Sequence, residues 1–365
     1  SGTSMDGVDL SVIKSDGNDQ FYSIYDTYKE FDDGLYNQLI ILRDKIGNST
    51  DLKTHSKEIN DLEKKFTLFN AHLINEVIKD INEDIDLIGF HGQTIFHNPQ
   101  ERISLQLGNG NLLSQLTKKK IVYNFRKNDI NNGGEGAPLT PIFHKLISTK
   151  LNTEFRISYP LNIINIGGIT NITRISYNDN LKAYDLGPGN CLIDEWIRKN
   201  SNKNFDENVL IGKSGKVDDL IYNQAVDNFS NLSLEKSLDV KDFDISFAKG
   251  LSLEDGCATI TKFTAYLIAE GLNKIYEEKI NSKRIYILCG GGRKNNFLVE
   301  NIKHFLLNQN VELKNIDDFK LNGDFIESQA FAYLAIRSYL KLPISFPDTT
   351  RCKFPISGGV INKNF

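Results

Sequence analysis

A carboxylate followed by a glycine-rich turn marks the part of the sequence best suited to acid–base chemistry. Asp185 lies at the C-terminal end of a β-type run, Leu181–Leu186, just before Gly187-Pro188-Gly189-Asn190. Ligands of α/β proteins bind at this end of the strands, and transfer of a phosphoryl group or of water needs a base that orients the nucleophile and takes its proton. We therefore predict that Asp185 is a general base. Asn190 and Asp194 begin the next helix, where the helix dipole alone accounts for Asp194.

Two short turns, each followed by a β-type run, have the composition of phosphate-binding loops. The first runs through Gly2-Thr3-Ser4-Met5-Asp6-Gly7-Val8-Asp9, and the second is Gly167-Gly168. Glycines let the backbone approach an anion, hydroxyls add donors, and Asp6 could hold Mg²⁺ through water. An ordinary β-turn explains the same residues, so both interpretations stay open. The shared form is a weak internal repeat. Because the chain starts at Ser1 without Met, we expect a strand to precede this motif in the full protein.

A third glycine-rich segment, Gly290-Gly291-Gly292, lies between a buried-strand pattern and a helix that begins near Asn295. Glycines leave room for a flat ligand, and a helix N-terminus favours anions, so the segment fits a nucleotide. A tight packing turn fits it equally. The dinucleotide fingerprint GxGxxG is absent. Gly212-Lys213-Ser214 is not a P-loop, because Glu207 stands where that motif requires Gly.

Polar residues after the strand pattern Ile85–Phe90 could bind a polar substrate such as a sugar, which needs directional partners. They are His91, Gln93 and Thr94. His91 could equally be a structural histidine that bonds the backbone. Arg126, Asp129 and the loop Gly133–Pro138 could form a second substrate wall, or Arg126 and Asp129 a solvated ion pair.

The elements that must position these residues alternate between strands and helices, which indicates an α/β protein. A length of 365 residues predicts two domains. We place them at 1–150 and 151–365, with a C-terminal tail that could pack back on the first. Expected strands are Val8–Lys14, Ile85–Phe90, Ile103–Leu107, Ile121–Phe125, Leu161–Ile166, Ile169–Tyr177, Leu181–Leu186 and Ile285–Cys289. The main expected helices are Leu35–Ile46, Ile59–Ile81, Asp255–Glu277 and Glu327–Leu340.

Composition excludes several function classes. The net charge of −4 gives no electrostatic reason to expect nucleic acid or an anionic membrane as a partner. No stretch approaches the ~18 continuous apolar residues of a membrane span. The four cysteines are scattered without metal-ligand spacing, which suits a reducing cytoplasm.

Taken together, the motifs resemble the anhydro-N-acetylmuramic acid kinases, a family of the actin/hexokinase/heat-shock-protein-70 superfamily. Seven stretches in family order carry the resemblance over nearly the whole chain. They are SGTSMDGVD at Ser1–Asp9, GFHGQT at Gly89–Thr94, FRKNDINNGGEGAPLTPIFH at Phe125–His144, NIGGITNIT at Asn165–Thr173, DLGPGNCLID at Asp185–Asp194, CGGGRKN at Cys289–Asn295, and ESQAFAYLA at Glu327–Ala335.

The resemblance implies two RNase H-like domains with ATP between them, and ATP-dependent conversion of 1,6-anhydro-N-acetylmuramic acid to N-acetylmuramic acid 6-phosphate in cell-wall recycling. It implies that Asp185 acts on water, that Gly2–Asp9 and Gly167-Gly168 meet the phosphates with Mg²⁺ near Asp6, and that a cytoplasmic homodimer forms. Adenosine would lie near Gly290, Gly291, Gly292 and Asn295. The sugar would contact His91, Gln93, Thr94, Arg126, Asn190 and Glu327.

Four positions depart from the family pattern: Leu186 in place of Thr or Ser, Glu135 in place of Gln, Lys236-Ser237-Leu238-Asp239, and the tail Asp348–Gly359. Glu135 would add negative charge near the pocket. Two other functions therefore stay open. One is another kinase of the superfamily, whose base deprotonates a hydroxyl of the substrate, and the other is a non-catalytic ATP-binding protein.

Overall fold

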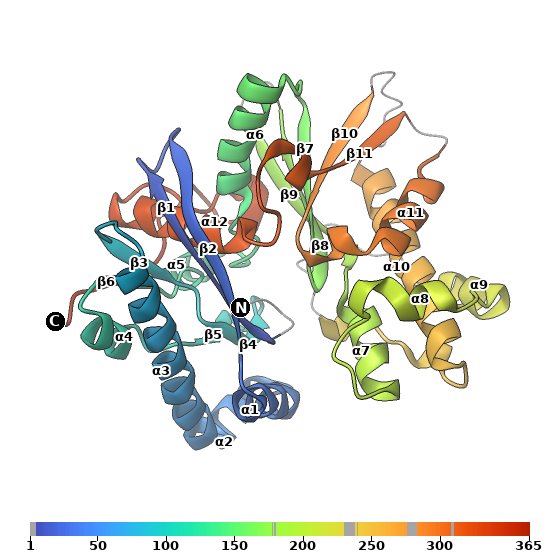
Figure 1. Ribbon diagram of the computed structural model, residues 1–365, viewed down its shortest axis with the longest axis horizontal. Helices are drawn as coiled ribbons and strands as arrows, with labels where there is room; N and C mark the ends of the chain where they lie inside the picture. The colour runs from blue at the N-terminus through green and yellow to red at the C-terminus, as the bar shows by residue number, and fades with distance from the viewer. Residues whose placement is uncertain are drawn as a thin grey trace. The chain divides into compact units, whose positions relative to one another are not determined.

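A computed structural model describes residues 5–176, 178, 180–229, 238, 240–275, 283–307 and 310–365. The chain divides into two compact units (Figure 1). Unit 1 comprises Ser1–Glu154 together with Phe325–Phe365, and unit 2 comprises Phe155–Asp324. Strands and helices mix in both units, so the α/β prediction is confirmed.

The last segment of the chain corrects the expected second domain, which ran to residue 365. Residues from Phe325 onward belong to unit 1, as the alternative of a returning tail anticipated. The reason is packing: α12 (Ile326–Tyr339) lies against β1 (Gly7–Ser15) and β3 (Leu87–Phe90). The hydroxyls of Ser11 and Ser328 lie 2.6 Å apart across the contact with β1.

The strands of unit 1 form three small sheets. β1 pairs antiparallel with β2 (Phe21–Glu30), and β4 (Gln93–Asn98) pairs with β5 (Ile103–Leu107). The third sheet has the order β12-β6-β3, with β6 (Lys120–Tyr123) parallel to β3 and antiparallel to β12 (Val360–Asn362). The remaining helices of this unit are α1 (Asp33–Lys45), α2 (Ser49–Thr54), α3 (Ser56–Asp80), α4 (Gly110–Thr117), α5 (Lys127–Asn131), α6 (Pro141–Phe155) and α13 (Pro347–Thr350).

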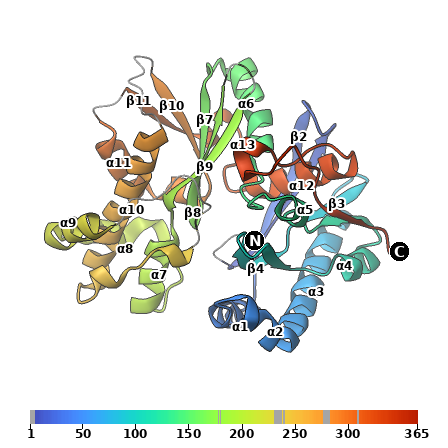
Figure 2. The same ribbon diagram turned by 180° about the vertical axis from the view of Figure 1, so that it is seen from behind.

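Unit 2 contains one five-stranded sheet in the order β11-β10-β7-β8-β9. β7 (Leu161–Ile166), β8 (Ile169–Ile175) and β9 (Leu181–Pro188) form an antiparallel meander, and β10 (Arg284–Cys289) and β11 (Val311–Asn315) continue it in parallel. β7 is central and almost fully buried, which explains its apolar run. Helices α10 (Leu253–Ile275) and α11 (Asn296–Phe305) pack against the sheet (Figure 2).

The other helices of unit 2 gather around α10, which is buried along most of its length. Small residues allow the close packing: a Cβ at Gly271 would lie 2.5 Å from the carbonyl oxygen of Leu186. These helices are α7 (Cys191–Asn200), α8 (Leu210–Ser214) and α9 (Asp219–Asn228), with 3₁₀ turns η1 (Glu207–Val209), η2 (Val240–Asp242), η3 (Ser246–Ala248), η4 (Gly291–Lys294) and η5 (Ile316–Phe319).

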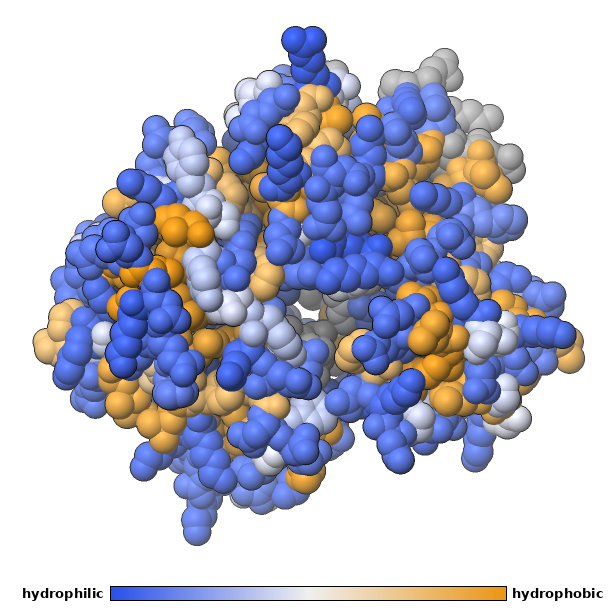
Figure 3. Space-filling model, viewed as in Figure 1, coloured by the Kyte–Doolittle hydropathy of each residue, from blue (hydrophilic) through white to orange (hydrophobic). Residues whose placement is uncertain are grey.

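The face shown in Figure 3 is largely hydrophilic, with apolar residues in separate patches. Among the residues that the structure describes, no helix combines the length and the apolar character that a membrane span requires.

Candidate active site

Asp185 lies on β9, opposite Asn171 of β8. Its Oδ2 accepts a hydrogen bond of 2.8 Å from the backbone N–H of Leu238, which fixes the orientation of the carboxylate. β9 continues to Pro188, beyond the expected end at Leu186, because its last residues still pair with β8. The proposed base therefore stands on a rigid strand rather than at its tip.

The turn after β7 and the turn after β9 are bonded directly to each other. The N–H groups of Gly189 and Asn190 each donate a 2.8 Å hydrogen bond, to the carbonyl oxygens of Gly168 and Gly167. A Cβ at Gly189 would lie 2.2 Å from the Gly167 oxygen, so only glycine fits there. At Gly167 a Cβ would approach nothing closer than 3.5 Å. The predicted phosphate turn thus has room for a ligand beside it.

The glycine segment after β10 combines packing with open space. Gly290 has a left-handed φ of 79°, and a Cβ there would lie 2.3 Å from Oδ1 of Asn165. Gly292 is packed as tightly, against Ile166. A Cβ at Gly291, in contrast, would meet only Nδ2 of Asn190, at 3.8 Å. Packing therefore explains two of the glycines, and the third leaves space for a flat ligand.

The two asparagines of this region have different roles. Asn295 caps α11, because its Oδ1 accepts a 2.9 Å hydrogen bond from the N–H of Leu298. Asn190 holds the corresponding position at α7, yet its side chain makes no capping hydrogen bond. Its amide lies beside Gly291 and Gly292 instead. Since β7, β9 and β10 run parallel, their carboxyl ends bring these groups to one edge of the sheet, where α/β proteins bind ligands.

In unit 1, the start of β1 collects negative charge. Gly2, Thr3 and Ser4 lie outside the described residues, and Val8 is part of the core. Met5 is buried with a φ of 57°, which is uncommon for a long side chain. Burial, together with the charges of Asp6, Glu30 and Asp9, raises the pKa of Tyr28.

The acidic residues at the start of β1 show whether this region could hold Mg²⁺. Within the described residues no group of three or more His, Cys, Asp or Glu side chains could enclose a metal. Mg²⁺ needs no such cage, because it usually keeps several waters and binds one or two carboxylates together with substrate phosphates. Asp6 and Asp9 therefore fit Mg²⁺ held largely by water and phosphate.

His91 and Arg126 form the centre of a second polar group in unit 1. Nη2 of Arg126 donates to Nε2 of His91 at 3.0 Å. Because Arg126 can only donate, Nδ1 of His91 carries the proton and donates to the carbonyl oxygen of Gly92 at 2.9 Å. Burial and the charge of Arg126 lower the pKa of His91 well below its ordinary value, so the ring is neutral. The backbone bond of a structural histidine is therefore present.

The rest of this group surrounds Arg126. Burial lowers the pKa of Arg126, and the negative charges of Glu327 and Asp129 oppose that effect. Its Nη1 donates to the carbonyl oxygen of Gly136 at 2.7 Å. Its buried Nε has no acceptor among the described residues. Because a buried charged donor is costly to leave unpaired, this N–H needs an acceptor that the described residues do not supply.

Gln93 and Thr94 lie next to this group in sequence, at the start of β4. Gln93 is buried. The Thr94 hydroxyl accepts a long, 3.4 Å hydrogen bond from Nε2 of Gln106. Thr94 therefore bonds a residue of β5, the strand that pairs with β4.

The alternative of a solvated ion pair between Arg126 and Asp129 is wrong, because Asp129 is buried and its carboxylate bonds other groups. The Asp129 carboxylate accepts 2.6 Å hydrogen bonds from the N–H of Gly136 and the hydroxyl of Thr350. It fastens the loop Gly133–Pro138 to both α5 and the C-terminal segment. That this loop forms a substrate wall stays a prediction.

Comparisons with known proteins agree with this arrangement. The family model for anhydro-N-acetylmuramic acid kinase matches residues 1–364. This chain belongs to the anhydro-N-acetylmuramic acid kinase family. A protein of that name from Pelagibacter ubique is 54% identical over 369 residues, covering 100% of this chain and 97% of the relative. One from Agrobacterium fabrum is 35% identical, covering 99% and 96%.

Solved structures overlap with this kinase only in part. The activator of 2-hydroxyisocaproyl-CoA dehydratase from Clostridium difficile, with bound ADPNP, has a TM-score of 0.30 at 18% identity and covers 51% of this chain and 62% of its own. The strand order of unit 2 is more informative. An antiparallel meander followed by two parallel strands is the order that the RNase H-like expectation requires.

The structure explains two of the departures from the family pattern. Leu186 is fully buried in the core between the sheet and α10, so it is a packing residue. Glu135 forms an ion pair with Arg351, and its backbone N–H bonds the carbonyl oxygen of Thr350 at 2.7 Å. The negative charge that Glu135 adds relative to the family pattern is therefore balanced by Arg351. In the third departure only Leu238 lies within the described residues.

Sequence reasoning missed Thr350 and Arg351, which bond Asp129 and Glu135 and so hold the loop Gly133–Pro138. They lie in the tail, which matches the family pattern only loosely, so no motif marked them. A hydroxyl and a cation more than two hundred residues from their partners give no local signal.

Proposed function

We propose that this kinase opens 1,6-anhydro-N-acetylmuramic acid with water and phosphorylates its O6, giving N-acetylmuramic acid 6-phosphate for the recycling of cell-wall sugar. The observation that carries the proposal is the position of Asp185 within unit 2. It lies on β9, whose following turn is hydrogen-bonded to the Gly167-Gly168 turn. Family membership over residues 1–364 gives the substrate.

The chemistry follows from the bond that must break. Water attacks C1 of the sugar and gives its proton to the Asp185 carboxylate, while the C1–O6 bond breaks and O6 takes the electron pair. O6 then forms a bond to the γ-phosphorus, and ADP leaves with the electrons of the broken P–O bond. Because O6 carries no proton in the anhydro sugar, the base acts on the water. The N–H of Leu238 holds the carboxylate in place for this task.

ATP supplies the phosphoryl group, and Mg²⁺ would neutralise the charge of its phosphates. We assign the phosphates to Gly2–Asp9 and to Gly167-Gly168, Mg²⁺ to Asp6 through water, and adenosine to Gly290, Gly291, Gly292 and Asn295. The open space beside Gly167 and Gly291 supports these assignments. Since Asn295 caps α11, we expect its effect on adenosine to come through the helix end.

We assign the sugar to His91, Gln93, Thr94, Arg126, Asn190 and Glu327. The unpaired Nε–H of Arg126 supports binding of an oxygen-rich substrate. The neutral His91 ring holds Arg126 rather than exchanging a proton with the substrate. A cytoplasmic location and a homodimer are further expectations from the family resemblance, which cell fractionation and sedimentation test.

The decisive experiment measures ADP release with Mg-ATP and the anhydro sugar, and in parallel with free N-acetylmuramic acid and glucose. We expect release only with the anhydro sugar. Asp185→Asn should lower kcat about 100- to 10,000-fold, the range for loss of a general base. Asp194→Asn, which changes a neighbouring helix-end carboxylate, is the matched control and should stay near the wild-type rate. Equal release with the free sugars would instead support a general sugar kinase.

A further inference from the structure

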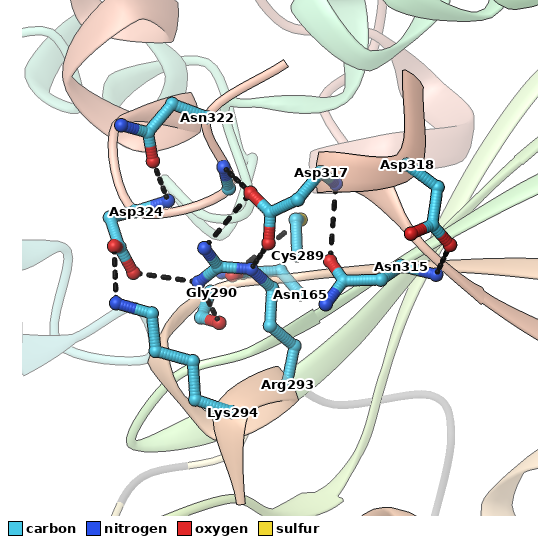
Figure 4. Close-up of polar contacts among 11 residues, drawn as sticks. Asn165, Cys289, Gly290, Arg293, Lys294, Asn315, Asp317, Asp318, Asn322 and Asp324 are labelled. Atoms are coloured by element: carbon cyan, nitrogen blue, oxygen red, sulfur yellow. Dashed lines mark hydrogen bonds and ion pairs between the residues drawn. The ribbon is translucent and has the colours of Figure 1, made fainter. Parts of the chain in front are cut away.

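The Arg293 side chain is the centre of a polar network in unit 2 (Figure 4). It is only 2% exposed. Nε and Nη2 donate to the two carboxylate oxygens of Asp317 at 2.7 and 3.1 Å. Nη1 donates to Oδ1 of Asp324 at 2.6 Å. This is the planar fork that arginine makes with carboxylates and that lysine cannot reproduce.

The same guanidinium holds the glycine turn proposed for adenosine. Nη1 also donates to the carbonyl oxygen of Gly290 at 3.0 Å. The N–H of Gly290 donates to the carbonyl oxygen of Gly323 at 3.2 Å. Gly323 in turn donates its N–H to Asp317 at 2.8 Å. Both polar groups of the left-handed Gly290 are therefore fixed by one interlocked set of contacts.

Space on the two sides of the turn is unequal. A Cβ at Gly323 would lie 2.3 Å from Nε of Arg293, so the side facing Arg293 is filled. At Gly291 a Cβ would have only the distant Asn190 amide as a neighbour. The Gly290–Gly292 turn is thus packed on the side that faces Arg293 and open beside Gly291.

The charge of Arg293 is already balanced. Although burial alone would raise the pKa values of Asp317 and Asp324, hydrogen bonds from Arg293 lower both below their ordinary value, so both are ionised at neutral pH. Lys294 adds an exposed ion pair to Asp324. A buried cation with two anionic partners is not available to a phosphate, so its role concerns the turn itself.

We propose that Arg293 is a positioning residue for the nucleotide. By tying Gly290 to the segment that carries Asp317 and Asp324, it keeps the turn in the conformation whose open side receives adenosine. This inference rests on the proposed function, because it takes the adenosine position from it. It adds a residue that touches neither substrate and yet sets the affinity for one of them.

The test compares Arg293→Met with wild type in the full-length protein. We expect the Kd for ADP and the KM for ATP to rise about tenfold, as expected for loss of hydrogen bonds to a charged group. The KM for the sugar should not change, because the recorded partners of Arg293, which are Gly290, Asp317 and Asp324, are not among the residues assigned to the sugar. Arg293→Lys should restore the affinity only partly, because an ammonium cannot form the fork. Calorimetry measures ADP binding, and steady-state kinetics measure both KM values.

Two controls separate positioning from a general loss of structure. Lys294→Met removes the exposed partner of Asp324, and Asp318→Asn changes a neighbouring carboxylate that bonds only the N–H of Asn315 in the recorded contacts. Both should bind ADP as wild type does. If Arg293→Met does not fold, Arg293→Lys and Asp324→Asn carry the test.

Each contrary result has a distinct meaning. Wild-type ADP affinity in folded Arg293 variants overturns this inference and leaves the proposed function intact. An equal rise in both KM values also overturns it, because that result describes a purely structural residue. Failure of the wild-type protein to bind ADP or ATP overturns the proposed function itself.

Discussion

At the residue scale, the ion pair between Glu135 and Arg351 gives a direct prediction. Glu135 is largely buried, with 19% of its side chain exposed. Replacing Arg351 with Met would leave this carboxylate without its cation beside the loop that Arg126 holds. We expect a loss of about 1–3 kcal/mol in the free energy of unfolding, the cost of an unsatisfied buried group, and a higher KM for the sugar. Urea denaturation and kinetics measure the two effects.

The matched variant is Glu135→Gln in the Arg351→Met background. Removing the unpaired charge should recover most of the lost stability, because neither ion partner then remains. If the double variant is as unstable as Arg351→Met alone, the charge of Glu135 is not the cause.

Single residues also mark the limit of prediction from sequence. Asp185, His91 and Arg126 stand in motifs, so their local setting could be predicted. The partners of Arg126 could not be predicted. Whether its side chain forms an ion pair in water or a hydrogen-bonded network that holds a loop depends on its burial, which the local sequence does not show. The hydrogen bonds from Arg293 to Asp317 and Asp324 could not be predicted from the local sequence either, because these partners come from a separate segment.

At the element scale, the packing of α12 on β3 depends on Gly89. A Cβ there would lie 2.6 Å from the carbonyl oxygen of Phe331 and 2.9 Å from Cβ of Ala335. Gly89→Ala should therefore destabilise the protein by about 1–3 kcal/mol, the usual cost of overpacking. Gly47→Ala, where the nearest atom would be 3.4 Å away, is the control. A wild-type midpoint in urea for Gly89→Ala would show that α12 can shift without cost.

Strand prediction succeeded at β7 and failed at β2, and burial explains the difference between these two strands. The run at β7 was predicted with its exact bounds, because a central strand is apolar on both faces. β2 was not predicted, since most of its residues are exposed and give no alternating pattern. The end of β9 was placed too early, because pairing with β8 carries the strand through Gly187 to Pro188.

At the scale of the whole molecule, three buried histidines make stability depend on pH. Burial lowers the pKa of His97 to about 4 and of His144 to about 3, and His91 is lowered as well. Below about pH 6.5 the unfolded chain takes up protons that the folded chain does not. The free energy of unfolding should therefore fall on acidification, by up to about 1.4 kcal/mol per pH unit for each histidine.

Urea unfolding between pH 7 and pH 4 measures this dependence. His144→Gln should make the slope shallower, whatever its effect at pH 7. His72→Gln, at an exposed position of α3, should keep the wild-type slope. An unchanged slope in His144→Gln would mean that His144 gains a proton in the folded state.

The boundary expected after residue 150 lies close to the observed division after Glu154. The return of the last segment to unit 1 was harder to predict, because helical periodicity in α12 says nothing about which sheet it covers.

The chain passes between the two units at two points, after Glu154 and after Asp324. The first crossing lies at the end of α6. The second directly follows Asp324, whose carboxylate accepts a hydrogen bond from Arg293. The backbone is held before both crossings, by the helix α6 at the first and by the bond from Arg293 to Asp324 at the second. Arg293 therefore holds the last residue of unit 2 before the chain returns to unit 1, in addition to holding the Gly290 turn.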